Sequence, residues 1–351
     1  MGAPGSSTLV HNDSVAIVTD PRFRDHDTGP AHPERPDRVR VLDELIAAWP
    51  GPHLTPIAPR PASRAEIAAV HSSGHLERIF ATRDAPGMRL DPDTPTSAGS
   101  ANTALLAAGG LIELVERVCV RDVATGFALV RPPGHHATAE RAMGFCLFNN
   151  VAIAARHLQS RQGIERVAII DFDLHHGNGT QAIFEHDPSV LYLSLHQYPW
   201  YPGTGGISEV GSGPGEGFTV NIPCGAGTDD ALYALAFDEI VAPVVRAFAP
   251  GFILVSAGFD AHRRDPLGQL ELSEAGYAHM TGVLLALGAE LCDGRVAFVL
   301  EGGYDLEALR GSTSAVLARL QGSGPHWTPR AGQPAQELAP LRHHFARWWP
   351  L

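Results

Sequence analysis

The chain has 351 residues, of which 44% are hydrophobic and 18% charged, so it can bury a large core and wholesale disorder is excluded. Acidic residues outnumber basic ones by 38 to 26, and the formal net charge of −12 argues against nucleic acid and anionic membranes as partners. Every basic residue is Arg and none is Lys. Mechanisms that need a lysine of the chain itself, such as Schiff-base chemistry or a Walker A phosphate site, are therefore excluded.

The cysteines and the chain start indicate a reducing compartment. The four cysteines are Cys119, Cys146, Cys224 and Cys292. They form no Cys-x-x-Cys pair, which argues against a zinc knuckle or a disulfide framework. Residues 1–8 lack the basic and apolar regions of an export signal, and no run reaches the ~20 apolar residues of a membrane span. We therefore expect a cytoplasmic protein.

Short runs rich in Val, Ile, Leu and Phe recur along the chain and predict buried strands. The predicted strands are 15–19, 127–131, 166–172, 190–195, 218–222, 252–256 and 295–300. The predicted helices are 101–120, 147–160, 229–248, 273–291 and 305–320. Thr228-Asp229 and Ser273 are suitable N-caps for two of these helices. The alternation of strand and helix predicts an α/β fold built on an open parallel sheet with helices on both faces.

We expect a single domain, because no repeat or low-complexity linker interrupts the middle of the chain. The folded domain is predicted to span 15–320, with a flexible N-terminal tail over 1–14 and a C-terminal extension over 321–351. The Gly- and Pro-rich segments 201–216 and 322–336 are predicted to form a surface loop and a tail.

Ligands of open parallel sheets bind beyond the carboxyl ends of the strands, so polar residues that follow an apolar run are candidates for function. Four such segments are rich in His, Asp and Glu. They are Arg131-Pro-Pro-Gly-His-His136, Asp173-Leu-His-His-Gly-Asn178, Ala257-Gly-Phe-Asp260 and Glu301-Gly-Gly-Tyr-Asp305. The sequence therefore predicts that four strand ends contribute side chains to one site.

The second and third segments have the composition of a metal site. Asp171, Asp173 and His175 alternate with a period of two, so their side chains share one side if the strand continues through them. Asp260 can complete a set of three protein ligands around a zinc-sized ion and leave an open position for water. Each residue alone would more often be a cap or a satisfied core residue, but their grouping at strand ends favours a metal site.

The first and fourth segments supply proton-transfer groups. Either imidazole of the pair His135 and His136 can move protons at neutral pH. Tyr304 follows two glycines, so its hydroxyl can turn toward a substrate carbonyl oxygen and act as an oxyanion donor. Metal, water, a histidine pair and a phenol together indicate amide hydrolysis. No Gly-x-Ser-x-Gly motif supports a covalent acyl-enzyme.

One motif allows a different interpretation. Residues 177–182 match the looser form of the dinucleotide-binding fingerprint after a strand. However, Asp173, His175 and His176 lie between that strand and the glycines, where a pyrophosphate would meet an anionic group. An NAD-binding protein is therefore the weaker alternative.

These residues together resemble the zinc-dependent histone deacetylase family, and especially its bacterial class II-like deacetylases and acetylpolyamine amidohydrolases. The resemblance runs from about His32 to about Tyr304. Its seven motifs are His32-Pro-Glu-Arg-Pro, Arg131-Pro-Pro-Gly-His-His, Gly144-Phe-Cys-Leu-Phe-Asn-Asn150, Asp171-Phe-Asp-Leu-His-His-Gly-Asn-Gly-Thr-Gln181, Tyr201-Pro-Gly-Thr-Gly205, Ser256-Ala-Gly-Phe-Asp260 and Glu301-Gly-Gly-Tyr304.

The resemblance implies an arginase-like fold that holds one Zn²⁺ through Asp173, His175 and Asp260, with a metal-bound water that attacks the acyl carbonyl. Arginases bind two metals, but the Asp260-Ala-His stretch lacks the further Asp that a second metal would need. The family also implies a structural potassium ion held mostly by backbone oxygens. The potassium site would lie near Asp171, Asp173, His175, Ser194 and Leu195.

The resemblance also implies roles for the proton-transfer groups. His136 would be the base and the acid, His135 an electrostatic partner held by Asp171, and Tyr304 the group that polarises the carbonyl. Asn178 stands where class I relatives have Asp, so His136 should be less biased toward its protonated form.

The substrate tunnel implied by the resemblance is lined by Gly144, Phe145 and Tyr201, with Leu267 at its mouth. Polyamine-selective members have Glu in the Asp-Pro-Glu-Gly turn, whereas this chain has Leu267. An apolar residue there favours acyl-lysine over a polyamine, unless a rim acid such as Asp93 attracts the cationic chain.

The sequence therefore predicts a zinc-dependent amidohydrolase that removes acetyl or other short acyl groups from acyl-lysine in peptides and proteins. The alternatives are a deacetylase of acetylpolyamines or other small acyl amides and, less favoured, a non-catalytic metal-binding protein. The sequence is compatible with a homo-oligomer.

Overall fold

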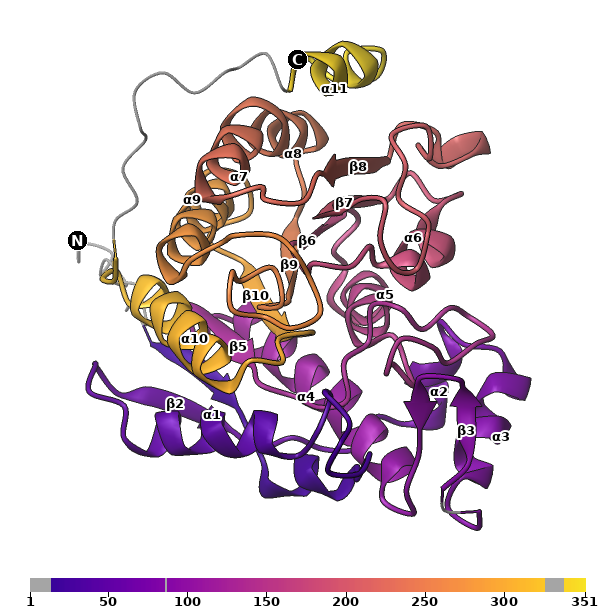
Figure 1. The fold of residues 1–351 in the computed structure, drawn as a ribbon. Helices are drawn as coiled ribbons and strands as arrows, with labels where there is room; N and C mark the ends of the chain where they lie inside the picture. Colours follow the sequence, from indigo (N-terminus) through magenta and orange to yellow (C-terminus); the bar gives the residue numbers. More distant parts are fainter. Residues whose placement is uncertain (1–13, 86, 326–337) are drawn as a thin grey trace, which may run out of the picture.

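The computed structural model describes residues 14–85, 87–325 and 338–351. Its central sheet has eight parallel strands in the order β2-β1-β5-β10-β9-β6-β7-β8 (Figure 1). These strands are β1 (Val15–Val18), β2 (Leu54–Ile57), β5 (Thr125–Ala128), β6 (Val167–Asp171), β7 (Val190–Gln197), β8 (Thr219–Cys224), β9 (Phe252–Ala257) and β10 (Val296–Leu300). A separate antiparallel pair joins β3 (Arg89–Asp91) to β4 (Thr94–Pro95).

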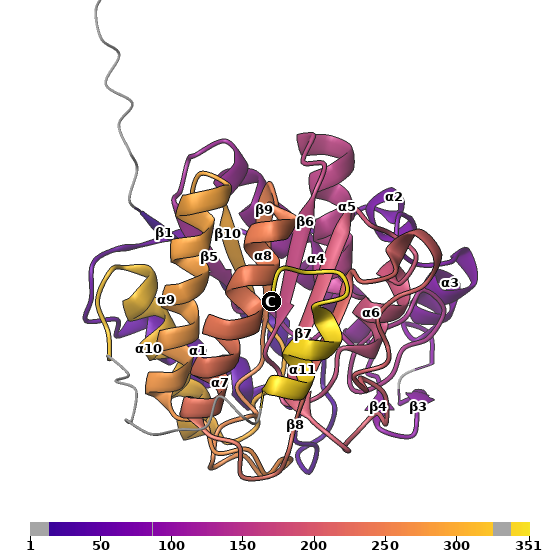
Figure 2. The ribbon, with the colours of Figure 1, turned by 90° about the horizontal axis from the view of Figure 1, so that it is seen from above.

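Helices cover both faces of the sheet (Figure 2). They are α1 (Asp37–Ala47), α2 (Arg64–Ala68), α3 (Ser73–Ala81), α4 (Ser100–Cys119), α5 (Asn150–Gln162), α6 (Asn178–Phe184), α7 (Asp230–Ala236), α8 (Ala242–Phe248), α9 (Glu274–Leu291), α10 (Leu306–Leu320) and α11 (Ala339–Phe345). Helices α4 and α5 pack on one face, and α7 to α10 pack on the other. None of the helices in the described ranges is long and apolar enough to cross a membrane.

The predicted fold class is confirmed, and all seven predicted strands are present, each with at least one shifted end. The eighth strand, β2, was not predicted, because it has four residues, contains Pro56 and lies at the sheet edge. The predicted helix 229–248 is interrupted by a π-helical segment at Phe237–Val241. Pro243 follows at the start of α8 and cannot donate the backbone hydrogen bond that an uninterrupted helix would need.

The two predicted N-caps differ in the structure. The Asp229 side chain accepts hydrogen bonds from the backbone N–H groups of Ala231 and Leu232, as a capping residue should. Ser273 occupies the N-cap position of α9 but makes no side-chain cap, because its hydroxyl instead donates to Asp230.

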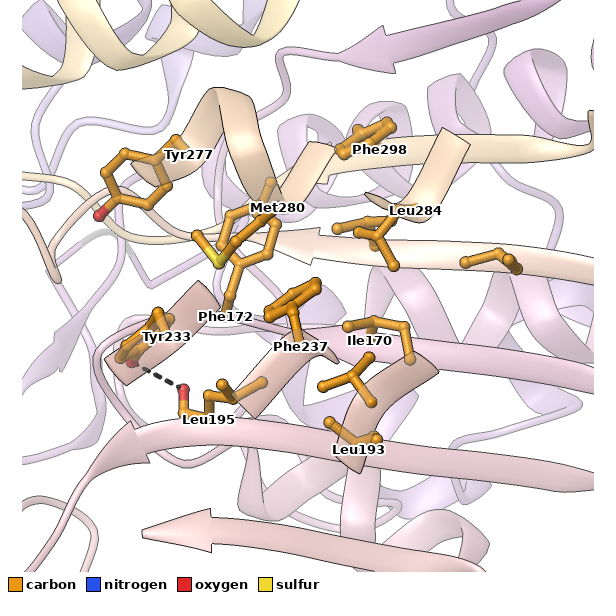
Figure 3. Packing of buried hydrophobic residues seen from close by; sticks show 14 of the residues in the cluster. Ile170, Phe172, Leu193, Leu195, Tyr233, Phe237, Tyr277, Met280, Leu284 and Phe298 are labelled. Atoms are coloured by element: carbon orange, nitrogen blue, oxygen red, sulfur yellow. Dashed lines mark hydrogen bonds between the residues drawn. The ribbon is translucent and has the colours of Figure 1, made fainter. Parts of the chain in front are cut away.

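A dense apolar layer fixes the strands that carry the functional segments (Figure 3). Side chains of the sheet face aromatic and aliphatic side chains of the covering helices. The labelled members are Ile170, Leu193, Leu195 and Phe298 from the sheet, Phe172 directly after β6, and Tyr233, Phe237, Tyr277, Met280 and Leu284 from the helices. The Tyr233 hydroxyl donates a 3.4 Å hydrogen bond to the Leu195 carbonyl, so it is buried with a partner.

The end of the chain packs onto the edge of the sheet. Phe345 and Trp349 are buried in the same core as the sheet residues. The Trp349 indole donates a 2.8 Å hydrogen bond to the Gly217 carbonyl and meets the Phe218 ring edge to face. Of the predicted tails, residues 1–13 and 326–337 lie outside the described residues.

Candidate active site

The four functional segments follow β5, β10, β9 and β6, which are neighbours in the sheet. Because these strands are parallel, their carboxyl ends meet at one edge and bring the segments together. The predicted convergence of four strand ends is therefore confirmed. The strand β6 ends at Asp171, so it does not continue through His175 as the period-two pattern required.

Two local turns replace the expected strand. The Asp173 N–H donates to Asp171 Oδ1 at 3.2 Å, and the His175 N–H donates to Asp173 Oδ1 at 2.9 Å. Short acidic side chains favour such turns because they bond to the backbone two residues on. Asp171 is thereby separated from the other two residues, and its carboxylate contacts His135.

Asp173, His175 and Asp260 form the one group of potential metal ligands found among the described residues, with ligand atoms all within 4.8 Å of one another. The distance from His175 Nδ1 is 3.0 Å to Asp260 Oδ2 and 3.3 Å to Asp173 Oδ1. All three residues are buried. Two buried carboxylates this close repel each other unless a cation lies between them.

The donor set fits a zinc ion, since two carboxylate oxygens and one imidazole nitrogen are among its usual ligands. Burial alone would lower the pKa of His175, but hydrogen bonds to Asp173 and Asp260 raise it to about 9. The two carboxylates thus favour positive charge at this position, and a bound divalent cation would supply such a charge.

Two glycines make room for these carboxylates. A Cβ at Gly258 would overlap Asp173 Oδ2, and a Cβ at Gly302 would overlap Asp260 Oδ2. The Gly302 N–H also donates to Asp173 Oδ2 at 2.8 Å. The backbone segments that follow β9 and β10 therefore lie directly against the ligand group. A residue with a side chain at either glycine position would prevent this close approach.

The two imidazoles of the histidine pair have different partners. His135 Nδ1 lies 3.0 Å from Asp171 Oδ2, which also accepts from the Tyr192 hydroxyl. His136 Nδ1 lies 2.8 Å from Asn178 Oδ1. An anionic partner stabilises the protonated imidazole, whereas a neutral amide does so much less.

The pKa values of the pair are shifted in opposite directions. Burial alone would lower the pKa of His135, but the carboxylates of Asp173 and Asp171 raise it to about 10. Burial lowers the pKa of His136 well below its usual range, and the neighbouring His135 and His175 lower it further. These surroundings favour the protonated form of His135 and the neutral form of His136, which can act as a base.

The ring of Tyr304 lies between aromatic and cationic groups. The Arg38 guanidinium carbon is 5.0 Å from the centre of the Tyr304 ring, and the Phe145 ring meets it edge to face at 5.8 Å. The Tyr304 N–H donates to Asp265 Oδ2 at 2.7 Å. Burial raises the pKa of the phenol well above its usual range, so it remains a hydrogen-bond donor.

Three of the four expected tunnel residues, Gly144, Phe145 and Tyr201, lie beside His136, His175 or Tyr304. Phe145 contacts Tyr304, and the Tyr201 ring centre is 5.2 Å from that of His136 and 5.9 Å from that of His175. A Cβ at Gly144 would overlap the His136 ring, so this glycine permits close approach of the two segments. Leu267 is half-buried, and its carbonyl accepts a hydrogen bond from Trp200.

Asp93 lies beside the same residues. Its Oδ1 accepts from the Gly144 N–H at 3.2 Å and from the Thr94 hydroxyl at 2.7 Å. The carboxylate contacts Tyr201 and, together with burial of that phenol, raises the Tyr201 pKa.

Two acids contribute to the site that sequence analysis had not assigned a role. Glu301 Oε2 accepts from the N–H groups of Gly134 and His135 at 2.7 and 3.1 Å, so it fixes the histidine segment. Glu34 joins the buried Arg38 to the buried Arg131. Each acid stands in a recognised motif, but its partners are distant in sequence, so spacing alone could not reveal the contact.

The glycine segment that matched the dinucleotide fingerprint is packed against a neighbouring segment. A Cβ at Gly179 would overlap the Ala137 carbonyl, so the turn lies directly against the segment that follows His136. This contact leaves no space for a pyrophosphate between them.

This fold and site have counterparts among known proteins. A model of the histone deacetylase domain matches residues 32–320. The chain therefore belongs to the histone deacetylase family.

Individual relatives agree with this assignment. Histone deacetylase 15 of Arabidopsis thaliana is 44% identical over 333 residues, which cover 92% of this chain and 59% of the plant protein. A probable deacetylase of Archaeoglobus fulgidus is 42% identical over 312 residues, covering 88% of this chain and 86% of that protein. The crystal structure of the HDA15 HD domain has a TM-score of 0.89 at 42% identity and covers 96% of this chain and 97% of its own. The chain thus spans only part of the plant relative's length.

Proposed function

We propose that the protein is a zinc-dependent deacylase that hydrolyses the side-chain amide of acyl-lysine. The observation that carries this proposal is the buried Asp173–His175–Asp260 group beside the neutral His136, whose ring centre is 5.9 Å from that of His175. A metal-ligand group next to a neutral imidazole is the arrangement that hydrolysis by an activated water needs.

Asp173, His175 and Asp260 would hold the ion, which when bound polarises the acyl carbonyl and activates water at neutral pH. His136 has its Nδ1 on the Asn178 side-chain oxygen, so Nδ1 carries the hydrogen and Nε2 is left to accept a proton. After the carbonyl has been attacked, the same nitrogen can return the proton to the leaving amine.

His135 and Tyr304 would stabilise the negative charge that develops on the acyl group. The carboxylates of Asp173 and Asp171 favour the protonated form of His135, which would stabilise a nearby anion without giving up its proton. Tyr304 would donate a hydrogen bond from its hydroxyl to the acyl oxygen. The positive charge of Arg38 over the ring favours that hydrogen bond.

The substrate would enter between Phe145 and Tyr201, with Leu267 at the mouth. An acylated lysine side chain is neutral and apolar along its length, so aromatic walls suit it. A deacetylase of acetylpolyamines is the second candidate, because the Asp93 carboxylate lies beside Tyr201 and could attract an ammonium group.

A structural potassium ion would lie near Asp171, Asp173, His175, Ser194 and Leu195. In support, Ser194 pairs in register with Asp171 across β6 and β7, so the two backbones lie side by side. Oxygen ligands of this kind suit a hard cation.

The proposal is tested with purified, zinc-loaded protein and three substrates, which are acetyl-lysine peptide, trifluoroacetyl-lysine peptide and acetylspermidine. We expect hydrolysis of the peptides, its loss on chelation and its return on adding Zn²⁺. Full activity after removal of the metal would contradict the mechanism, and a clear preference for acetylspermidine would favour the second candidate.

A further inference from the structure

A buried acid, Asp265, lies where the turn that carries Leu267 meets the segment that carries Tyr304. The Asp265 side chain belongs to a residue that is only 7% exposed. Burying a carboxyl group costs free energy unless hydrogen bonds replace those it made to water. The partners that replace water therefore indicate what this side chain does in the fold.

The Asp265 carboxyl group accepts hydrogen bonds from three backbone N–H groups. Oδ1 accepts from Leu267 at 3.0 Å, and Oδ2 accepts from Tyr304 at 2.7 Å and from Asp305 at 3.2 Å. Leu267 is two positions from Asp265 in the chain, whereas Tyr304 is 39 positions away. One side chain thus joins the turn at the tunnel mouth to the backbone of the tyrosine.

The turn that carries Asp265 packs on the segment of the metal ligands, 173–175. A Cβ at Gly268 would overlap the Leu174 side chain, which stands at the centre of that segment, so the two pieces of backbone are in direct contact. The position of the turn is therefore fixed relative to the ligand group. Through its carboxyl group, Asp265 extends this fixed arrangement to Tyr304.

The backbone before Tyr304 needs such support because two glycines precede the tyrosine. Gly303 has a φ of +120°, a conformation that residues with a side chain rarely adopt. The peptide group between Gly303 and Tyr304 is held from both sides. Its carbonyl accepts from Arg38 Nε at 2.7 Å, and its N–H donates to Asp265. These two bonds fix the direction in which the tyrosine side chain leaves the chain.

We propose that Asp265 is a positioning residue for the reaction, because it holds Tyr304 where the phenol hydroxyl can reach the acyl oxygen of a substrate in the tunnel. The inference rests on the proposed deacylase function and adds a residue to its machinery. Asp265 acts through Tyr304 and has no direct role in the chemistry. A hydrogen-bond donor that is displaced by about 1 Å can cost a reaction about 10²-fold in rate.

The test is a double-mutant cycle of Asp265→Ala with Tyr304→Phe in the zinc-loaded protein, with acetyl-lysine peptide as substrate. We expect Asp265→Ala alone to lower kcat about 10- to 100-fold. In the Tyr304→Phe background the same change should lower kcat less than about twofold, because the hydroxyl through which Asp265 acts is already absent. A general loss of structure would lower kcat by the same factor in both backgrounds.

Asp265→Asn is the conservative variant, and it also serves if the Ala protein does not fold. The single oxygen of the amide can accept on one side only, so it can keep the bonds to Tyr304 and Asp305 or the bond to Leu267, but not both. We expect a smaller loss of kcat than in Asp265→Ala, and we expect this loss also to disappear in the Tyr304→Phe background.

Asp230→Ala is the matched control. Asp230 is half-buried, and its Oδ1 accepts from the Ser273 N–H at 2.8 Å while its Oδ2 accepts from the Ser273 hydroxyl. Like Asp265 it joins two segments that are distant in the chain, but its partner lies outside the site. This variant should lose stability and keep kcat within about twofold.

Hydrogen exchange over residues 302–306 tests the same contact without any substrate. The amides of Tyr304 and Asp305 should exchange faster in Asp265→Ala than in the unmodified protein, and Asp230→Ala should leave them unchanged. Equal fold-losses of kcat in both backgrounds would overturn the proposal, as would an unchanged kcat or unchanged exchange in Asp265→Ala. If the unmodified protein cleaves no substrate, the deacylase function fails, and exchange alone then decides whether Asp265 holds Tyr304.

Discussion

Glu34→Gln removes one negative charge from a fully buried ion network and should strongly destabilise the fold. Glu34, Arg38 and Arg131 are each 0% exposed, and Glu34 Oε2 accepts from Arg131 at 2.8 Å while Oε1 lies 3.1 Å from an Arg38 nitrogen. The amide is nearly isosteric but leaves two buried guanidinium groups without a counter-charge. Breaking a buried ion pair on one side typically costs about 3–5 kcal/mol.

The acidity of Glu34 gives an independent figure. Burial alone would raise its pKa, but Arg131 and Arg38 lower it from the ordinary 4.5 to about 2. That difference corresponds to roughly 3 kcal/mol of preference for the ionised form in the fold. Because the folded pKa is depressed, this stabilisation is complete above about pH 4.5 and is lost as the pH falls toward 2.

The assay is guanidinium unfolding of the protein and of Glu34→Gln at pH 7 and at several values below pH 4.5. The control is Glu290→Gln, because Glu290 pairs with Arg246 at 2.9 Å but both side chains are about half exposed. We expect the control to lose less than about 1 kcal/mol. A loss of under 1 kcal/mol for Glu34→Gln, or a deficit that does not shrink with falling pH, would refute the argument.

Further predictions concern the site. Tyr304→Phe should lower kcat about 10²–10³-fold with unchanged metal content, because one oxyanion donor is lost, and steady-state kinetics with elemental analysis checks this. Asp173→Ala and Asp260→Ala should lose both bound zinc and activity, whereas His136→Ala should keep the zinc and lose turnover; a His136→Ala protein that still turns over would assign the base to another residue. Leu267→Glu should raise kcat/KM for acetylspermidine and lower it for acetyl-lysine peptide by a swing of about 1 kcal/mol, since the new charge is partly solvated. Competition kinetics would detect the swing, and an unchanged ratio would show that this turn does not set the substrate class.

Much of the fold and of the ligand group could be predicted because the signals are local. Apolar runs marked the strands, and polar residues directly after them marked Asp173, His175 and Asp260. The geometry of the turns could not be predicted, since hydrogen bonds from side chain to backbone, rather than strand periodicity, place His175.

The network of buried charged residues around Glu34 could not be predicted from local sequence patterns. Glu34 and Arg131 are 97 positions apart, and Arg38 donates to the Gly303 carbonyl 265 positions away. Such contacts depend on how distant segments pack. The same limit applies to Trp349, whose partner Gly217 is 132 positions earlier in the chain.

The segment 338–351 packs on the core of the domain. The region that matches the family and the region that packs as one unit therefore have different borders. The family match ends at Leu320, yet Phe345 and Trp349 beyond it belong to the same buried core as Phe248, and the Trp349 ring packs edge to face on the Phe218 ring. A recombinant protein cut at that border would expose the apolar side chains that Phe345 and Trp349 cover. Self-association in concentrated solution would then reflect an uncovered edge rather than any natural oligomer.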